Sequence, residues 1–316
     1  MQRCVATVPS SIRGPPRPTV DEEKQVSTAS DATEWGAPTA KALLEPDPPR
    51  GRSGPAKRKP ATILALANQK GGVGKTTTTI SLGAAFAELG ERVLLVDMDP
   101  QGSLGVGLGV EPHGRDATVY DLLMQEDVSL DAVLVETGTD QMHLLPANID
   151  LAAAELLLVQ EVAREQALQR VLERLRYRYD RILIDCPPSL GLLTINGLTA
   201  ADGVLVPLEC EYFALRGMSL LMQTLERVQA RLNPELKLEG IIATMFDPRT
   251  LHGREVLERV REAFGDAVLE TTVSKTIRFA EAPVAGEPIL SYATRSRGAQ
   301  AYRDLAKEVR AREPSS

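Results

Sequence analysis

The sequence has few cysteines and few aromatic residues, and it contains no long apolar run. Its three cysteines, Cys4, Cys186 and Cys210, are odd in number, and their spacing suits neither a zinc site nor a disulfide framework. Aromatic residues make up only 4% of the chain, and no stretch reaches the ~18 apolar residues of a membrane helix. The N-terminus lacks the apolar core of a secretory signal. We therefore expect a cytoplasmic protein with reduced, buried thiols and no membrane association.

An excess of positive charge is also missing. The formal net charge is −7, so nothing global attracts the chain to nucleic acid, and any DNA contact needs a local basic patch. Apolar residues make up 43% of the 316 residues, which is enough for a substantial core.

The first 60 residues differ from the rest. They contain ten of the 21 prolines, with Ser, Thr and Gly between them, and show no sustained period of 2 or 3.6. We predict a disordered tail over 1–60 and one folded domain over 61–312. The tail holds the only tryptophan, Trp35, which is either a docking anchor or present by chance. The tail closes with a basic cluster that forms either a solvated linker or a weak, non-specific DNA contact. Its members are Arg50, Arg52, Lys57, Arg58 and Lys59.

A glycine-rich stretch follows the apolar run at 61–67. It reads KGGVGKTTTT, and residues with helical spacing come after it, so the context is strand, turn and helix. Glycines let backbone N–H groups close around phosphate oxygens, and the N-terminus of the helix adds unpaired amides. We predict that this loop binds the nucleotide through eight residues: Lys70, Gly71, Gly72, Val73, Gly74, Lys75, Thr76 and Thr77.

Three residues of this loop have predicted roles. Lys75 can reach the β- and γ-phosphates, the Thr76 hydroxyl can ligate Mg²⁺, and Thr77 can bond a phosphate further back. The general pattern would place its first glycine at position 69, but the residue there is Gln69, and Lys70 follows. This is the deviant Walker A pattern, in which Lys70 is the signature lysine.

The remainder alternates between strand and helix patterns. This predicts right-handed crossovers and an α/β fold with a doubly wound, mostly parallel sheet that has helices on both faces, as in P-loop NTPases. The predicted strands are 61–67, 92–96, 142–145, 181–184, 204–209, 238–245 and 267–270. The predicted helices are 75–89, 118–124, 149–160, 164–177, 215–232, 255–264 and 298–310, and residues 101–110 are predicted to form a glycine-rich loop.

Aspartates close two of the buried strands. Asp97 and Asp99 follow one strand, and Asp185 follows another about 120 residues after the P-loop motif, in the Walker B pattern. Ligands of open α/β sheets lie at the carboxyl ends of strands, so these carboxylates are placed to act on water and Mg²⁺. Asp97 has an alternative interpretation, a structural hydrogen-bonding group at a strand end.

Five segments together resemble one family. They are KGGVGKTTTT, VLLVDMDPQG, ILIDCPPSLG, EYFALRGMSLL and IRFAEAPVAGEPILSY, and they are similar to ParA/Soj-type partition ATPases over 61 to about 310. The resemblance implies weak ATP hydrolysis with Mg²⁺, an ATP-bound homodimer, stimulation by a ParB-type centromere-binding partner and association with the nucleoid.

The resemblance also implies roles for single residues. Lys70 would cross the dimer interface to the partner's ATP, Asp99 would position the attacking water, and Asp97 would lie near Mg²⁺. Asp185 would fit the second shell of that ion. Three further residues fall in segments that border the adenine in the family: Phe246, Asp247 and Pro283.

DNA binding in this family is non-specific and depends on ATP. The positions that carry it match Arg249 and Arg278, whose contacts to phosphates would carry no base information. The alternative is that these arginines are ordinary solvated charges. Four more basic residues lie nearby in the sequence: Arg254, Lys275, Arg295 and Arg297.

Three other functions have recognisable requirements. A MinD-like membrane-associated ATPase needs an amphipathic C-terminal anchor, but the chain ends in AYRDLAKEVRAREPSS, with few bulky apolar residues. A reductase like the nitrogenase iron protein needs cysteines that ligate a cluster. A nucleotide-gated transcriptional regulator of this family usually adds a helix-turn-helix module before the P-loop, where this chain is rich in proline.

Overall fold

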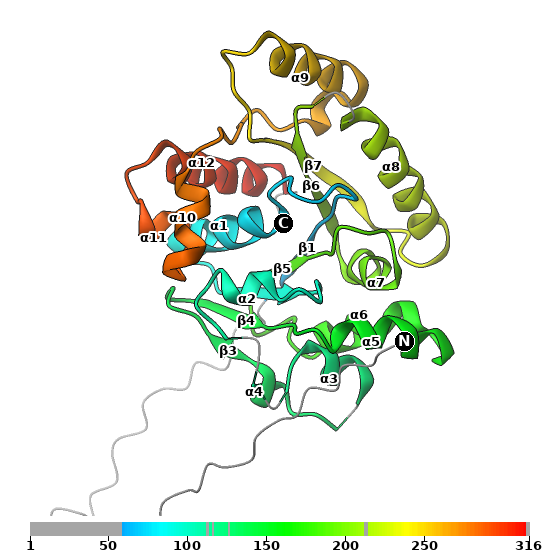
Figure 1. Cartoon of the computed structure of the whole chain (residues 1–316). Helices are drawn as coiled ribbons and strands as arrows, with labels where there is room; N and C mark the ends of the chain where they lie inside the picture. The colour runs from blue at the N-terminus through cyan, green and yellow to red at the C-terminus, as the bar shows by residue number, and fades with distance from the viewer. Residues whose placement is uncertain (1–58, 112–113, 116, 126, 212–213, 314–316) are drawn as a thin grey trace, which may run out of the picture. The chain divides into compact units, whose positions relative to one another are not determined.

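The computed structural model describes residues 59–313 except 112–113, 116, 126 and 212–213. The described part contains a seven-stranded sheet in the order β3-β4-β2-β5-β1-β6-β7, parallel except for β3 against β4 (Figure 1). The fold is the predicted doubly wound α/β fold of P-loop NTPases. The strands are β1 Thr62–Leu66, β2 Val93–Asp97, β3 Val135–Glu136, β4 Met142–Leu145, β5 Arg181–Asp185, β6 Gly203–Glu209 and β7 Lys237–Thr244.

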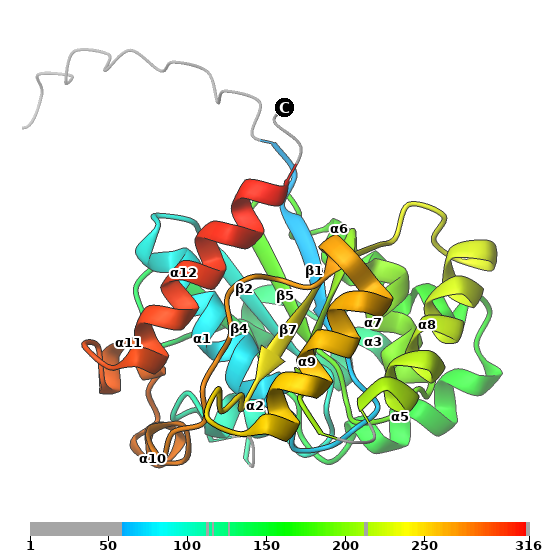
Figure 2. The ribbon, with the colours of Figure 1, turned by 90° about the horizontal axis from the view of Figure 1, so that it is seen from above.

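Helices cover both faces of the sheet (Figures 1 and 2). The α-helices are α1 Lys75–Glu88, α2 Ser103–Val106, α3 Val119–Met124, α4 Leu130–Val133, α5 Leu151–Leu157, α6 Ala167–Glu173, α7 Leu192–Ala200, α8 Ala214–Arg231, α9 Leu251–Phe264, α10 Arg278–Ala285, α11 Ile289–Tyr292 and α12 Arg297–Arg312. Three short 3₁₀ helices are η1 Leu158–Gln160, η2 Arg164–Gln166 and η3 Gly265–Ala267.

The central strands are apolar throughout because both of their faces are buried. In β1, Ile63 and Ala65 face a core shared with α3 and α5 to α9, whereas Leu64 and Leu66 face a second core shared with α1, α11 and α12. Parallel strands and their crossovers bring the ends of β1, β2 and β5 to one edge of the sheet, which we call the carboxyl edge.

The predicted strand at 267–270 is wrong. Residues 265–267 form η3, and Val268 makes only an isolated bridge to Ile241. The reason lies in α12: the carboxylate of Glu308 accepts hydrogen bonds from the backbone N–H groups of Glu270 and Thr271, at 2.7 and 2.9 Å. These donors are then not available to a sheet ladder.

Other boundaries also differ from the predictions. The helix predicted at 255–264 begins at Leu251, because the hydroxyl of Thr250 caps it by accepting from the N–H of Gly253. The glycine-rich loop at 101–110 contains the short helix α2, and α7, α10 and α11 were not predicted. The predicted tail lies outside the described residues apart from Lys59 and Pro60, so it stays a prediction together with the suggested roles of Trp35.

The C-terminal helix α12 packs against α1, the helix that follows the P-loop. Its apolar side chains Tyr302, Leu305 and Val309 are buried, and the hydroxyl groups of Tyr302 and Thr78 lie 3.1 Å apart. The apolar stripe of α12 is therefore part of the core rather than a free amphipathic face. Among the described helices, none has the length and apolar character needed to span a bilayer.

Candidate nucleotide-binding site

The loop from Lys70 to Gly74 connects β1 to α1 at the carboxyl edge. Gly72 and Gly74 have φ of 77° and 84°, a left-handed conformation that glycine adopts without steric cost. The carbonyl of Val73 accepts a 2.8 Å hydrogen bond from the hydroxyl of Thr244, which ties the loop to the end of β7. No side chain caps α1 at Gly74, so the first amides of α1 remain available to an anion.

Lys75, Thr76 and Asp185 form a tight cluster under this loop. The hydroxyl of Thr76 donates to Asp185 Oδ2 at 2.7 Å, and Thr79 donates to Oδ1 at 3.2 Å. The ammonium of Lys75 lies 3.3 Å from the carbonyl of Lys70, so it folds back over the loop. A lysine in this position faces the space that the loop amides enclose, where phosphate oxygens would lie.

Burial shifts the ionisation of this cluster. It lowers the pKa of Lys75, although the negative charge of Asp185 opposes the shift. Burial also raises the pKa of Asp185 to about 6, against the hydrogen bond from Thr76 and the charge of Lys75. A buried carboxylate beside a hydroxyl is a fitting donor set for Mg²⁺, and the glycine loop fits the phosphates of ATP. The residues present therefore suit both cofactors.

Asp97 lies beside Asp185 in the paired strands β2 and β5. It is fully buried, and its two oxygens accept the backbone N–H groups of Asp99 and Leu104 at 3.0 and 3.1 Å. Burial, with the nearby charge of Asp185, raises the pKa of Asp97 well above its usual range. In this structure Asp97 holds the turn that carries Asp99, and its proximity to Mg²⁺ stays a prediction.

Asp99 lies on that turn, half-buried at the carboxyl edge. Its Oδ1 accepts the backbone N–H of Gln101 at 3.0 Å, which fixes the side chain. The negative charge of Asp99, like that of Asp185, opposes the lowering of the pKa of Lys75 by burial. The placement suits a carboxylate that orients water near the phosphates.

Lys70 points away from the Lys75 cluster. Its ammonium pairs with Glu209 at 2.8 Å and with Glu211 at 2.6 Å, both at the end of β6. Partial burial lowers the pKa of Lys70, but these hydrogen bonds outweigh burial and the net shift is upward. Neither glutamate was predicted from the sequence as a partner of Lys70. The sequence did offer one indication of Glu209, because this residue ends a buried strand and so lies at the carboxyl edge.

Removing both carboxylates should free Lys70. Exposed ion pairs contribute about 0–1 kcal/mol each, so removing two of them with Glu209→Gln and Glu211→Gln should tighten ATP-dependent dimerisation by up to ~30-fold for each Lys70 that acts on a second copy. Light scattering across a protein dilution series with an ATP analogue and Mg²⁺ measures this. Glu226→Gln, on an exposed face of α8, is the matched control. Unchanged or weaker dimerisation would show that the glutamates do not compete for Lys70.

The residues predicted to border the adenine do not gather in one place. Phe246 and Asp247 line a cavity of about 750 Å³ between the start of α9, the segment before α10 and the start of α12. Pro283 instead lies in α10 and lines a separate small hollow with Thr77. Hydrogen bonds from Arg249 lower the pKa of Asp247 to about 2. The structure thus brings Phe246 and Asp247 together but places Pro283 apart.

The larger cavity has a basic rim. Arg249 and Arg278 line it, which places both predicted DNA contacts on one surface. Each also pairs with a carboxylate, Arg249 with Asp247 at 2.8 Å and Arg278 with Glu281 at 2.9 Å. Lys275 and Arg297 line the same cavity, whereas Arg254 and Arg295 do not.

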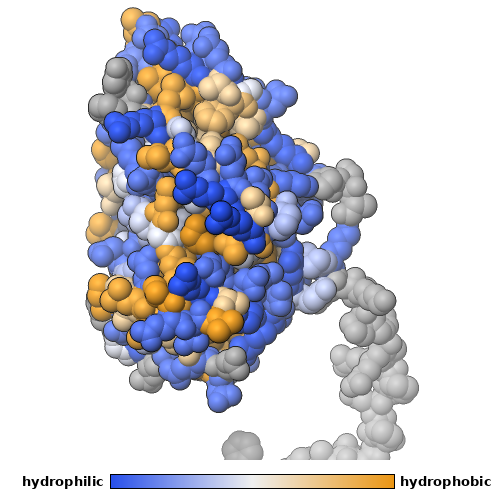
Figure 3. Space-filling model, turned by 90° about the vertical axis from the view of Figure 1, so that its right-hand side faces the viewer, coloured by the Kyte–Doolittle hydropathy of each residue, from blue (hydrophilic) through white to orange (hydrophobic). Residues whose placement is uncertain are grey.

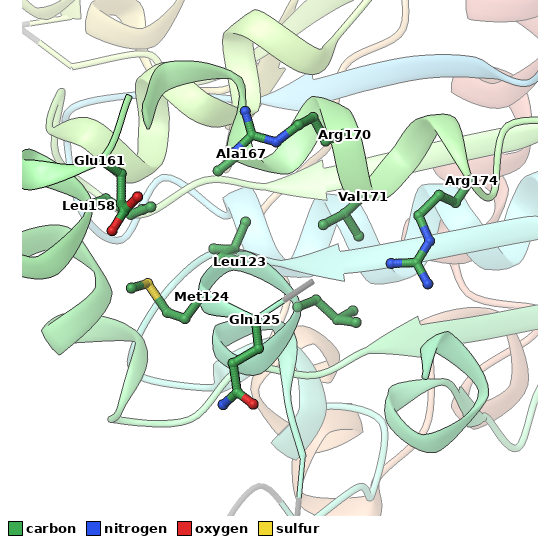
Figure 4. A pocket seen from close by; sticks show the side chains of 10 residues that line it. Leu123, Met124, Gln125, Leu158, Glu161, Ala167, Arg170, Val171 and Arg174 are labelled. Atoms are coloured by element: carbon green, nitrogen blue, oxygen red, sulfur yellow. The ribbon is translucent and has the colours of Figure 1, made fainter. Parts of the chain in front are cut away.

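The described part has another cavity, of about 360 Å³, between α3, η1 and α6 (Figure 4). Leu123, Leu158 and Val171 are among its lining residues, together with Arg170 and Arg174. It contains none of the predicted site residues. Cys186 and Cys210 are both buried, so neither is exposed as a cluster ligand would have to be at a subunit interface.

Comparisons with known proteins identify the family of the chain. A family model described as an AAA domain matches residues 61–238. The chain is 50% identical to the sporulation initiation inhibitor protein Soj of Bacillus subtilis, over 79% of this chain and 98% of Soj. It is 48% identical to the chromosome partitioning protein ParA of Caulobacter vibrioides, over 80% of this chain and 96% of ParA.

A solved structure with similar sequence carries the cofactors. It is called cobyrinic acid a,c-diamide synthase from Mycobacterium smegmatis, with bound ADP and magnesium. The identity is 47% and the TM-score 0.69, over 78% of this chain and 93% of that one. The same protein has also been solved with an ATP analogue and magnesium. ATP and Mg²⁺ are accordingly the cofactors of this fold and site, and the chain belongs to the ParA/Soj family of deviant Walker A P-loop ATPases.

Proposed function

We propose that the chain is an ATP-hydrolysing DNA partition protein. Its ATP-bound dimer binds DNA without sequence preference, and a ParB-type partner stimulates hydrolysis and so drives segregation of a chromosome or plasmid. We place it in the cytoplasm, on the nucleoid. The names of the relatives support the partition role, and the residues of the site support the chemistry.

One observation carries this proposal. Lys75, Thr76 and Asp185 cluster beneath the loop, Asp99 stands at its opening, and Lys70 faces away from all of them. Bound Mg²⁺ would be held by the Thr76 hydroxyl with Asp185 behind it, and would neutralise phosphate charge. Lys75 adds positive charge from the same chain, and Asp99 orients the attacking water. Lys70 contacts the ATP that is bound by a second copy of the chain.

The arginines that line the basic cavity support the proposed DNA binding. Arg249 and Arg278 share one surface, so a dimer presents two such surfaces despite the net charge of −7. Contacts of this kind go to phosphates and are sequence-independent. The two alternatives find less support: the apolar stripe of α12 is buried against α1, and a helix-turn-helix module would fall outside the described residues.

Arg278→Glu tests the DNA step. Each phosphate contact contributes a salt slope of about −0.9, so losing Arg278 from both copies should reduce the slope by up to ~2 units and weaken ATP-dependent binding at least ~10-fold. The assay is filter binding with ATP, using unrelated duplexes across a salt series. Arg249→Glu should act in the same direction.

The matched control is Arg227→Glu on α8, an exposed arginine that does not line the basic cavity. Dimerisation and basal hydrolysis should survive in both variants. If Arg278→Glu binds as the unmodified protein does, while deletion of residues 1–57 removes binding, then the DNA contact belongs to that deleted segment and this assignment is wrong.

A further inference from the structure

The 360 Å³ cavity between α3, η1 and α6 has an apolar floor and a charged mouth. Five of its apolar lining residues are at most 8% exposed: Leu122, Leu123, Leu158, Ala167 and Val171. Its four polar lining residues are all exposed: Gln125, Glu161, Arg170 and Arg174. Figure 3 shows the side of the molecule that carries α6 to α8, where apolar patches interrupt a mainly hydrophilic surface. A buried apolar floor below a few polar groups is typical of a small-molecule site.

The arginines at the mouth are the unpaired ones of their segment. Residues 164–178 contain five arginines, and three of them form ion pairs: Arg164 with Glu165, Arg176 with Asp202 and Arg178 with Asp131. The other two, Arg170 and Arg174, have no ion pair with any residue that the structure describes. They are also the two arginines that line the cavity. An anion at the mouth would therefore meet two guanidinium groups that no carboxylate already holds.

Arg170 and Arg174 approach the cavity from the same face of α6. They lie at positions i and i+4, with Arg174 as the C-terminal cap, so their side chains leave the helix one above the other. Nη1 of Arg170 donates to the carbonyl of Ala163 at 3.3 Å, which holds this side chain over the mouth. Figure 4 shows both guanidinium groups across the cavity from Gln125. The two arginines can thus act on one ligand from the same side.

Both walls of the cavity are held in place by side-chain hydrogen bonds. The side chain of Asn196 in α7 accepts the N–H of Leu168 at 3.1 Å and donates to the carbonyl of Arg164 at 2.9 Å, which fixes the start of α6. On the other wall, Asp121 accepts the N–H of Thr118 at 2.8 Å in the capping box that begins α3. A cavity between anchored helices is preformed, so a ligand does not have to order these walls when it binds.

We propose that this cavity binds a small organic anion that has an apolar body and a single carboxylate. The body would fill the floor, and the carboxylate would accept hydrogen bonds from Arg170 and Arg174, whose guanidinium groups match its geometry. The two arginines and Glu161 give the mouth a net charge of +1, which one carboxylate neutralises. A phosphate would instead add about two negative charges beside Glu161.

This site is separate from the groups of the proposed function. None of its lining residues is among those assigned to ATP, Mg²⁺ or DNA. Its volume of 360 Å³ lies at the lower end of the range of ~300–1,000 Å³ that is typical of small-molecule sites, so the ligand is a small one. The anion would bind here whether or not the protein hydrolyses ATP.

Isothermal titration calorimetry of the full chain with phenylbutyrate tests this proposal. The dissociation constant should be about 1 mM or lower, and it should be at least ~10-fold higher for the neutral amide of the same acid. Arg170→Gln combined with Arg174→Gln should weaken binding of the acid at least ~10-fold and leave the weak binding of the amide unchanged. The matched control is Arg227→Gln with Arg231→Gln, because these arginines are also exposed and lie at positions i and i+4 of a helix, α8.

A second measurement uses the unmodified protein and so does not depend on the folding of a variant. In methyl NMR spectra of methionine-labelled protein, phenylbutyrate should shift the signal of Met124, which lines the cavity, but not that of Met218, which is buried in α8. Met124→Leu assigns the signal. Equal affinities for the acid and the amide would overturn the anionic class of the ligand. Absence of binding, absence of a Met124 shift, or equal binding by the arginine double variant and its control would overturn the site itself.

Discussion

Lys70→Ala should leave the protein monomeric in the presence of ATP and Mg²⁺. The ammonium of Lys70 makes no contact with its own Lys75 cluster, since Glu209 and Glu211 hold it on the other side. Truncation keeps the backbone groups of the loop, including the carbonyl that receives the ammonium of Lys75. Nucleotide binding should therefore change little, whereas the trans contact is lost entirely. Light scattering with ATP and titration with a fluorescent ADP separate the two effects.

Lys75→Ala is the informative contrast for this experiment. It removes the cation from the phosphate side of the loop and should weaken nucleotide binding itself. Hydrolysis and DNA binding should fail in both variants, but only Lys70→Ala should retain ADP. A Lys70→Ala protein that dimerises normally with ATP would exclude the trans role of Lys70.

Asp99→Ala should reduce ATP hydrolysis by about 100-fold or more, within the range expected for a group that orients or deprotonates the nucleophile. ATP binding depends on the loop and on Lys75, so the ATP-bound dimer should accumulate. Single-turnover hydrolysis and light scattering on the same sample measure both results. Asp99→Asn serves as the conservative comparison, because it keeps an oxygen that can accept the N–H of Gln101.

Asp97→Asn distinguishes a structural role of this carboxylate from a catalytic one. Both oxygens of Asp97 accept backbone donors of the turn, so the substitution should lower thermal stability as well as activity. Asp99→Asn should leave the melting temperature nearly unchanged. If Asp99→Asn hydrolyses ATP at the unmodified rate, the carboxylate of Asp99 does not hold the water.

The local parts of this site could be predicted because their signals are contiguous. A glycine loop between a strand and a helix, and aspartates that end buried strands, specify their own geometry. The partners of Lys70 could not be predicted, because Glu209 and Glu211 lie 139 and 141 residues away and meet it only when β6 pairs with β1. The false strand at 267–270 has a similar origin, since Glu308 reaches it from α12. Sequence periodicity carries no information about such distant competitors for a backbone amide.

The packing of α12 on α1 has a consequence for synthesis. The first strand of the folded domain pairs with β5 and β6, and the first helix is covered by the last one. During translation, the nascent chain therefore exposes the apolar side of α1 until α12 has left the ribosome. Transiently exposed apolar surface invites aggregation, so this is the interval in which chaperones would be needed. A chain that terminates early, before Tyr302, would keep its P-loop sequence but lack the helix that covers α1.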